Sequence, residues 1–202
     1  SIAADVAVVG DAKLVLGQLA DAAPPVRERP WTVELAAFRA EYERAVESEC
    51  SPGSAGPLRT KQVVHALNRV FADGFVLVHE NGGQDLWSYY CPFVKVTMHR
   101  GCVAPAEQTV MGLGVAGAIG ARLARPDADV VCVTGDGAFQ MYMKEIPTAL
   151  QHAAPVLWVV LDNAALGWPQ YLQILERQPL IVTDFGTPPY LADAARAQGA
   201  HA

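Results

Sequence analysis

Two polar segments, each directly after an apolar run, carry the side chains best suited to chemistry. Gly135, Asp136 and Gly137 follow "DVVCVT", and Asp162-Asn163 follows "PVLWVVL". Glycine lets the backbone approach an anion closely, and the N–H groups at the start of a helix favour phosphate oxygens. Asp136 and Asn163 offer the hard oxygen atoms that Mg²⁺ prefers. The pattern therefore predicts a site that clamps Mg²⁺ and a diphosphate.

The elements that must position these residues alternate between strands and helices from residue 58 onward. Strands are expected at 75–80, 93–98, 129–134 and 155–163, and helices at 60–73, late in 107–126, and at 138–150. Thr60 is the expected N-cap of the first of these helices. Nearly continuous apolar strands indicate a parallel sheet covered on both faces. The predicted fold class is α/β, a doubly wound, mainly parallel sheet flanked by helices, in which ligands bind at the carboxyl ends of the strands.

Residues 1–57 are organised differently. A strand within 5–9, a turn at Gly10-Asp11 and a helix to about Asp21 are expected first. A Pro-rich break and a second helix follow, with apolar residues at helical spacing: Leu35, Phe38, Tyr42 and Val46. These elements are too small to bury a core of their own. We interpret 1–22 as the tail of a preceding domain, 23–57 as a connecting arm and linker, and 58–202 as the main domain.

Composition excludes several classes of function. A net charge of −6 argues against a nucleic-acid partner, which would require a basic surface. No apolar run is long enough to span a membrane. The four cysteines have no C-x-x-C spacing, so neither a zinc site nor a disulfide framework is expected, and Cys132 is interpreted as a core residue. A cytoplasmic protein fits these features best.

The G-D-G segment followed by Asn after the next strand resembles the thiamine diphosphate (ThDP) motif. The family with this motif includes acetolactate synthase, pyruvate decarboxylase, oxalyl-CoA decarboxylase and 2-hydroxyacyl-CoA lyase. The resemblance implies that Asp136, the Asn163 side chain and the backbone carbonyl of Ala165 hold Mg²⁺. It also implies that Gly135 lies against the diphosphate and that Gly137 and Ala138 offer it N–H groups.

Two further segments extend the resemblance. "MGLGVAGAIGA" is similar to a family segment in which Met111 would support the thiazolium ring of the cofactor in its bent, reactive conformation. "ENGGQDLW" is similar to a family loop in which Gly83 and Gln84 would contact the diphosphate. The alternatives are that Met111 only fills the core and that residues 81–84 only form a tight turn.

Three positions depart from the family pattern or add to it. Asp162 replaces an Asn that faces away from the metal in the family, so little effect is expected. Leu172 stands where acetolactate synthases have a substrate-selecting Trp, which disfavours that activity. Glu107, shortly before Met111, is either a general acid–base near the reactive carbon or a solvent-facing residue. With Glu107 as the catalytic residue, the sequence favours a 2-hydroxyacyl-CoA lyase.

Other functions remain open at this point. A 2-oxo acid decarboxylase or an acetolactate synthase-like carboligase is the alternative within the family, and a non-catalytic regulatory domain is another. His79 and His99 could each line the substrate cleft or simply be satisfied hydrogen-bonding residues, and Arg100 could pair with an anionic substrate group or with a carboxylate.

The resemblance also implies partners for this chain. The family binds ThDP between this domain and a pyrimidine-binding domain, usually of another subunit, so that domain is expected on another chain or in a missing N-terminal part. A small-molecule substrate, with acyl-CoA as the first candidate, and a homodimer or homotetramer of the full enzyme are expected. The main domain is also expected to lack its final strand.

Overall fold

The computed structural model describes the chain except residues 1–2, 26–28, 52–55, 90–92, 105–109 and 188–189. The chain divides into two compact units, Ser1–Tyr42 and Glu43–Ala202. The first unit contains helix α1 (Ala12–Ala22), whose N-cap Asp11 accepts the N–H of Leu14 at 3.1 Å. Helix α2 (Pro30–Cys50) begins in the first unit and ends in the second.

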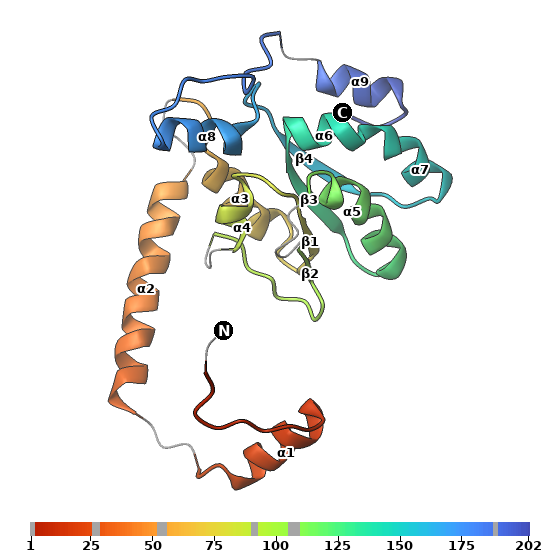
Figure 1. Cartoon of the computed structure of the whole chain (residues 1–202). Helices are drawn as coiled ribbons and strands as arrows, with labels where there is room; N and C mark the ends of the chain where they lie inside the picture. The colour runs from red at the N-terminus through yellow and green to blue at the C-terminus, as the bar shows by residue number, and fades with distance from the viewer. Residues whose placement is uncertain (1–2, 26–28, 52–55, 90–92, 105–109, 188–189) are drawn as a thin grey trace. The chain divides into compact units, whose positions relative to one another are not determined.

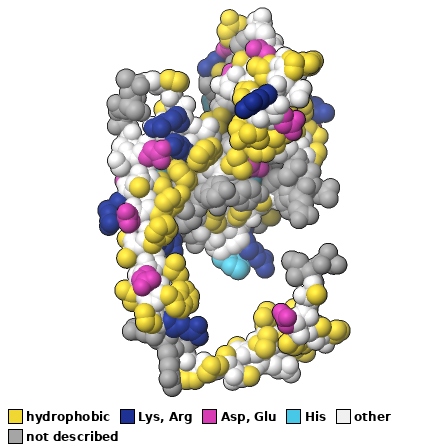
Figure 2. Space-filling view, turned by 60° about the vertical axis from the view of Figure 1, so that its left-hand side comes forward, with side chains coloured by type: hydrophobic (Ala, Val, Ile, Leu, Met, Phe, Trp, Pro, Cys, Tyr) yellow, Lys and Arg dark blue, Asp and Glu magenta, His cyan; other side chains and the backbone are white. Residues whose placement is uncertain are grey.

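The strand expected within residues 5–9 does not form. Residues 3–9 contain no strand, and Val6, Val8 and Val9 are 81%, 64% and 100% exposed. A strand needs a neighbouring strand to satisfy its N–H and C=O groups, and the described residues provide none here. Hydrophobic side chains are likewise exposed along α1 and α2 (Figure 2).

The second unit is built around a sheet of parallel strands (Figure 1). Its strands are β1 (Val76–His79), β2 (Cys102–Val103), β3 (Val130–Gly135) and β4 (Leu157–Leu161), in the order β2-β1-β3-β4. The chain moves outward from β1 to β2 and then crosses back to β3 on the other side of β1. This reversal confirms the doubly wound fold and creates a topological switch point between β1 and β3.

The two faces of the sheet bury alternate residues of the same strands. On one face Leu77 and Val131 pack with the end of α2 and with α3 (Thr60–Val70). On the other face Val78 and Cys132 pack with Ala118 of α5 (Leu113–Ala124). Successive side chains of a strand point to opposite faces of the sheet. Where helices cover both faces, every residue of the strand is buried, so the strand sequence is apolar throughout. Full burial of Cys132 confirms its expected place in the core.

The helix expected at 138–150 is divided. Helix α6 (Asp136–Tyr142) is followed by a 3₁₀ turn (Met143–Glu145) and then by α7 (Ile146–Gln151). Pro147 lies in the first turn of α7. Proline has no N–H to donate and clashes with the preceding turn of a continuous helix, but it fits the start of one. The remaining helices are α4 (Asp85–Tyr89), α8 (Gly167–Leu175) and α9 (Leu191–Ala197).

The strand expected at 93–98 is absent because a side chain takes the place of a neighbouring strand. The Asn68 amide donates to the carbonyl of Phe93 at 2.9 Å and accepts the N–H of Lys95 at 2.7 Å. Phe93 and Val94 are buried in the core cluster beside α3. These apolar residues therefore pack as part of a loop. The strand that pairs with β1 on the side away from β3 is the short strand β2.

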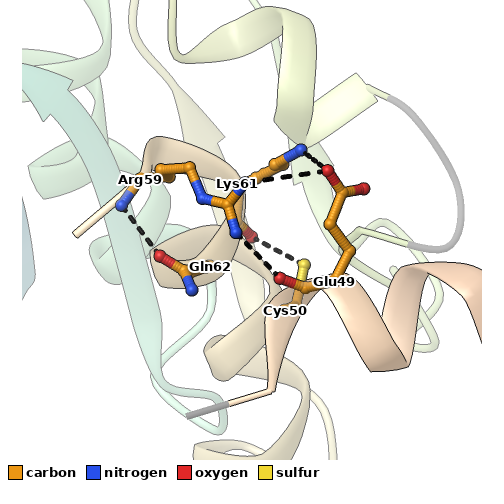
Figure 3. A network of polar contacts seen from close by, with 5 residues as sticks. All are labelled: Glu49, Cys50, Arg59, Lys61 and Gln62. Carbon is orange, nitrogen blue, oxygen red and sulfur yellow. Dashed lines mark hydrogen bonds and ion pairs between the residues drawn. The ribbon is translucent and has the colours of Figure 1, made fainter. Parts of the chain in front are cut away.

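The N-cap of α3 is Arg59 and not Thr60, which is the first helical residue. The N–H of Arg59 donates to the side chain of Gln62 at 3.0 Å. The Arg59 guanidinium donates to the carbonyl of Glu49 at 3.2 Å, and Lys61 forms an ion pair with the Glu49 carboxylate (Figure 3). These contacts attach the end of α2 to the start of α3.

Within the described residues, none of the helices combines the length and the apolar character needed to cross a membrane.

His79 ends β1 and is 2% exposed. Its Nδ1 lies 2.6 Å from the hydroxyl of Ser88, which itself donates to the carbonyl of Asp85 at 3.1 Å. The two contacts hold the imidazole and the hydroxyl together beside α4. Burial lowers the pKa of His79 from 6.5 to about 4. The ring is thus neutral at pH 7 and fixes the loop that follows β1.

The buried neutral imidazole predicts acid-sensitive stability. Between pH 6.5 and about 4 the unfolded chain binds a proton at His79 that the folded chain does not. The free energy of unfolding should fall as the pH is lowered through this range, by up to about 3 kcal/mol from this residue. Urea denaturation at pH 7.5, 5.5 and 4.5 measures it. His79→Gln should show a smaller loss of stability than the unmodified chain, and equal losses would contradict the assignment.

Candidate functional site

The loops that follow β1 and β3 meet at the switch point, and α6 begins directly after β3. Asp136 is the first residue of α6, and its side chain is only 2% exposed. Its Oδ1 accepts the N–H of Gly137 at 3.0 Å, whereas Oδ2 is buried without a hydrogen-bond partner. Burial raises the pKa of Asp136, and the neighbouring Asp162 raises it further. An unpaired buried carboxylate oxygen is costly unless a ligand satisfies it.

Asn163 and Ala165 complete a small group of polar atoms around Asp136. One side-chain atom of the Asn163 amide lies 2.9 Å from the Ala165 carbonyl oxygen and 3.2 Å from Asp136 Oδ1. In the structure this atom is the amide oxygen, and with Asp136 Oδ1 and the Ala165 carbonyl oxygen it makes a set of three oxygens, the ligand type that Mg²⁺ prefers. With the amide turned over, the nitrogen takes this position and donates to both oxygens. These three residues fit a magnesium ion, and that they hold one stays a prediction.

The candidate site differs from a site made only of charged ligands. In the part of the chain that the structure describes, no three His, Cys, Asp or Glu side chains gather to hold a metal. An amide and a backbone carbonyl would have to contribute beside Asp136. Such a mixed oxygen set suits a hard cation that is also coordinated by phosphate oxygens.

Asp162 influences this group, whereas the expectation that it faces away from the metal stays a prediction. Its Oδ1 accepts the N–H of Ala164 at 3.0 Å, and its nearby carboxyl raises the pKa of Asp136. Ala164 has a φ of +54°, a left-handed conformation that turns its N–H toward both carboxyls. The conformation of this turn brings Asp162 to the candidate site.

Met111 lies against the same turn. A Cβ atom added to Gly137 would lie 3.5 Å from Met111 Cε and 3.0 Å from Leu166 Cδ2. Ala138, the next residue of α6, is 2% exposed. The structure therefore brings Met111 to the first turn of α6, although its role beside a thiazolium ring remains a prediction. The N–H groups of that turn have no acceptors within the helix, but the N–H of Gly137 already bonds to Asp136.

The loop after β1 brings Gln84 to Gly135. Gln84 is buried, its Nε2 donates to the carbonyl of Glu80 at 2.8 Å, and its Oε1 would lie 3.8 Å from a Cβ atom on Gly135. A Cβ atom on Gly83 would meet nothing within 4 Å. Gln84 is thus at the candidate site, and Gly83 precedes it in the same loop. That they contact a diphosphate stays a prediction.

Sequence reasoning missed Glu80, which is fully buried. Its Oε1 accepts the N–H of Asn81 and the N–H of Gly112, each at 2.8 Å, and its Oε2 accepts the N–H of Val115 at 3.0 Å. Gly112 is the N-cap of α5 and has no side chain with which to cap the helix. Glu80 caps it instead, and its negative charge is favourable at a helix N-terminus. A carboxylate directly after a buried apolar strand was the signal in the sequence.

Gly112 is the position in this turn where only glycine fits. Its φ is +93°, and a Cβ atom there would lie 1.9 Å from the ring of Tyr142. Any other residue would have to displace the Tyr142 ring in a backbone conformation that L-residues disfavour. The turn that presents Met111 therefore depends on Gly112 as well as on Glu80.

Not all expected residues lie at this site. His99 precedes β2, and its carbonyl accepts from Arg125 at 3.0 Å. With Arg100 it lies just before β2, at the amino ends of the strands, away from the candidate site. Glu107 lies outside the described residues. Trp168 and Tyr171 stack at 5.6 Å on α8, where Leu172 is also partly exposed.

Comparison with known proteins identifies the fold and its cofactor. The family model of the C-terminal thiamine pyrophosphate-binding domain of thiamine pyrophosphate enzymes matches residues 83–202. The chain belongs to this family. Its members are domains of ThDP-dependent enzymes, which also use Mg²⁺.

Two relatives similar in sequence are an acetolactate synthase subunit and a thiamine pyrophosphate-containing protein. The chain is 33% identical to the acetolactate synthase isozyme 3 large subunit of Escherichia coli, over 83% of this chain and 29% of the relative. It is 33% identical to a Bacillus subtilis protein described as thiamine pyrophosphate-containing, over 68% of this chain and 24% of the relative. These matches span less than a third of each relative.

One solved structure has a similar fold. It is the ThDP-dependent 4-hydroxybenzoylformate decarboxylase of Rhodococcus jostii, with a TM-score of 0.62 and 24% sequence identity. The similarity covers 74% of this chain and 28% of that one.

The buried Glu80 carboxylate predicts a large loss of stability on truncation. Glu80→Ala leaves three buried N–H groups without acceptors and should reduce the free energy of unfolding by roughly 3 kcal/mol or more. Glu80→Gln should be intermediate, because one side of the amide places a donor against a donor. Chemical denaturation measures both variants.

Glu176→Ala, at an exposed position on the cap of α8, is the matched control and should change stability by less than about 0.5 kcal/mol. An Ala variant at Glu80 as stable as this control would show that the carboxylate does not hold the start of α5.

Proposed function

We propose that the carboxyl edge of the sheet binds the Mg²⁺–diphosphate end of ThDP. The observation that carries this proposal is the group formed by Asp136, Asn163 and the Ala165 carbonyl, with a buried carboxylate oxygen that has no partner. The family assignment and the position of the group at the switch point support it.

Different residues of this edge bind the cation, the diphosphate and the cofactor ring. Asp136, Asn163 and Ala165 hold the cation, and the first turn of α6, with Gly135, Gly137 and Ala138, receives the diphosphate. Gly83 and Gln84 line the same space from the loop after β1, and Met111 supports the cofactor ring from the turn before α5. When bound, ThDP supplies a carbanion that attacks a carbonyl and an electron sink for the reaction that follows.

We infer that the whole protein forms or cleaves a carbon–carbon bond next to a carbonyl, and that it does so as an acetolactate synthase-like carboligase of 2-oxo acids. The relatives named acetolactate synthase support this choice, including one from Mycobacterium avium that is 29% identical over 92% of this chain. The second candidate is a 2-hydroxyacyl-CoA lyase. Leu172, in place of the substrate-selecting Trp of acetolactate synthases, favours it.

A complete active site requires more than this chain. The pyrimidine half of the cofactor would be held by a further domain of the same protein or of a second subunit, in a homodimer or homotetramer. The chain spans about a quarter to a third of the length of its curated relatives, which leaves room for such a domain. The substrate would be a small molecule, a 2-oxo acid for a carboligase or an acyl-CoA for a lyase.

Asp136→Asn tests the cofactor site directly. Calorimetric titration of the whole protein with ThDP in the presence of Mg²⁺ should show binding, and the variant should weaken it by on the order of 100-fold because the cation loses its buried carboxylate ligand. Asp193→Asn, an exposed position paired with Arg196 on α9, is the control with the same change of charge. Equal binding by the Asp136 variant and the control would refute the proposed site.

An assay of the whole protein distinguishes the two candidate reactions. With pyruvate, a carboligase should release CO₂ and form acetolactate, and the Asp136→Asn variant should do neither. Cleavage of a 2-hydroxyacyl-CoA without turnover of pyruvate would instead establish the lyase.

A further inference from the structure

The turn before α5 places Met111 beside a residue that has no side chain of its own to hold it. Gly112 has a φ of +93°, in the left-handed region that glycine adopts readily. Because glycine is the most permissive residue, such a turn keeps one conformation only if its surroundings restrict it. Glu80 bonds to the N–H of Gly112 at 2.8 Å. A second residue, Tyr142 of α6, packs against the same glycine.

The ring of Tyr142 fills the space beside the Cα atom of Gly112. An ideal Cβ atom on Gly112 would lie 1.9 Å from Cδ2, 2.0 Å from Cε2 and 2.7 Å from Cγ of this ring. Since non-bonded carbon atoms are in contact at about 3.5–4.0 Å, the ring leaves no room for even one added carbon. The contact therefore blocks movement of the turn toward α6.

The Tyr142 ring is itself held in place. It is partly buried and packs against a cluster of buried side chains from α5, α6, α7 and α9: Val115, Phe139, Ile146, Leu191 and Ala195. The Nζ atom of Lys144 lies 5.7 Å from the ring centroid, within range of a favourable cation–π contact. A ring held in this way can restrict Gly112, because movement of the ring would disturb the core cluster.

Helix α6 meets the turn at both of its ends. At the first turn of the helix, Met111 Cε lies 3.5 Å from an ideal Cβ atom on Gly137. At its last residue, Tyr142 covers Gly112. The side chain of Met111 and the glycine that follows it are thus placed against one helix.

We propose that Tyr142 is a positioning residue, whose ring holds Gly112 so that Met111 meets the thiazolium ring of the cofactor in a preformed position. The inference rests on the proposed function, because it concerns the side chain proposed to support that ring. Tyr142 lies at the end of α6 opposite to Asp136. Its role therefore concerns the ring of the cofactor and not the cation or the diphosphate.

Two calorimetric titrations of the whole protein, both with Mg²⁺, distinguish these parts of the cofactor. Tyr142→Leu removes the flat ring and keeps an apolar side chain in the cluster. It should weaken binding of ThDP about tenfold and binding of inorganic diphosphate by less than about twofold, because inorganic diphosphate has no ring for Met111 to support. Tyr142→Phe keeps the ring and should bind both ligands like the unmodified protein. Tyr190→Leu is the matched control and should change neither affinity, since Tyr190 is 82% exposed at the N-cap of α9.

The outcomes separate this inference from the proposed function. Equal weakening of ThDP and diphosphate binding by Tyr142→Leu would show that Tyr142 supports α6 as a whole, and would overturn the inference. Unchanged ThDP binding by this variant would overturn it too. Failure of the unmodified protein to bind ThDP would instead refute the proposed function.

A double-mutant cycle tests the contact between Tyr142 and Gly112 without the cofactor. Gly112→Ala adds a Cβ atom that meets the ring, and should lower the midpoint of thermal unfolding. In the Tyr142→Ala background the ring is absent, so the same change should lower the midpoint by less. Losses that simply add would contradict the contact on which the inference depends.

Discussion

The structure of the site depends on one buried carboxylate, that of Glu80. It stands at the end of β1, where the chain reverses direction across the sheet, and it accepts N–H groups from its own loop and from the start of α5. Its backbone carbonyl accepts the Gln84 amide. Two segments about 30 residues apart are thereby held together by one residue, and charge-assisted hydrogen bonds of this kind are about twice as strong as neutral ones. The positions of Gln84 and Met111 follow from it.

Two buried carboxylates at the same edge of the sheet differ in how their oxygens are hydrogen-bonded. Glu80 is surrounded by donors, so it is satisfied without a ligand and acts as a part of the fold. Asp136 is equally buried but has one oxygen without a partner and a second carboxylate beside it. Burial alone therefore does not mark a ligand site, because both residues are buried. The number of donors around each carboxylate distinguishes Glu80, which organises the backbone, from Asp136, which we propose as a cation ligand.

Much of the fold and of the candidate site could be predicted from the sequence where local pattern decides the outcome. β1, β3 and β4 are apolar runs of strand length, and the Gly-Asp-Gly and Asn positions follow directly from where two of these strands end. Prediction failed where the local structure depends on a distant side chain or on an unusual backbone conformation. The 93–98 segment looks like a strand, but the side chain of Asn68 satisfies its backbone. The Asp162 carboxyl accepts the N–H of Ala164, which has a left-handed conformation, and no residue type in that turn predicts this conformation.

The proposed cofactor edge and the proposed substrate residues differ in burial. The proposed cation and diphosphate edge includes the buried side chains of Asp136 and Gln84 and the carbonyl of Ala165. Trp168, Tyr171 and Leu172 follow on α8, where their side chains are exposed and contribute little to the core. Exposed residues can change without loss of the fold. We therefore propose that the choice of substrate depends on exposed residues such as Leu172 of α8, and not on the edge of the sheet proposed to bind the cofactor.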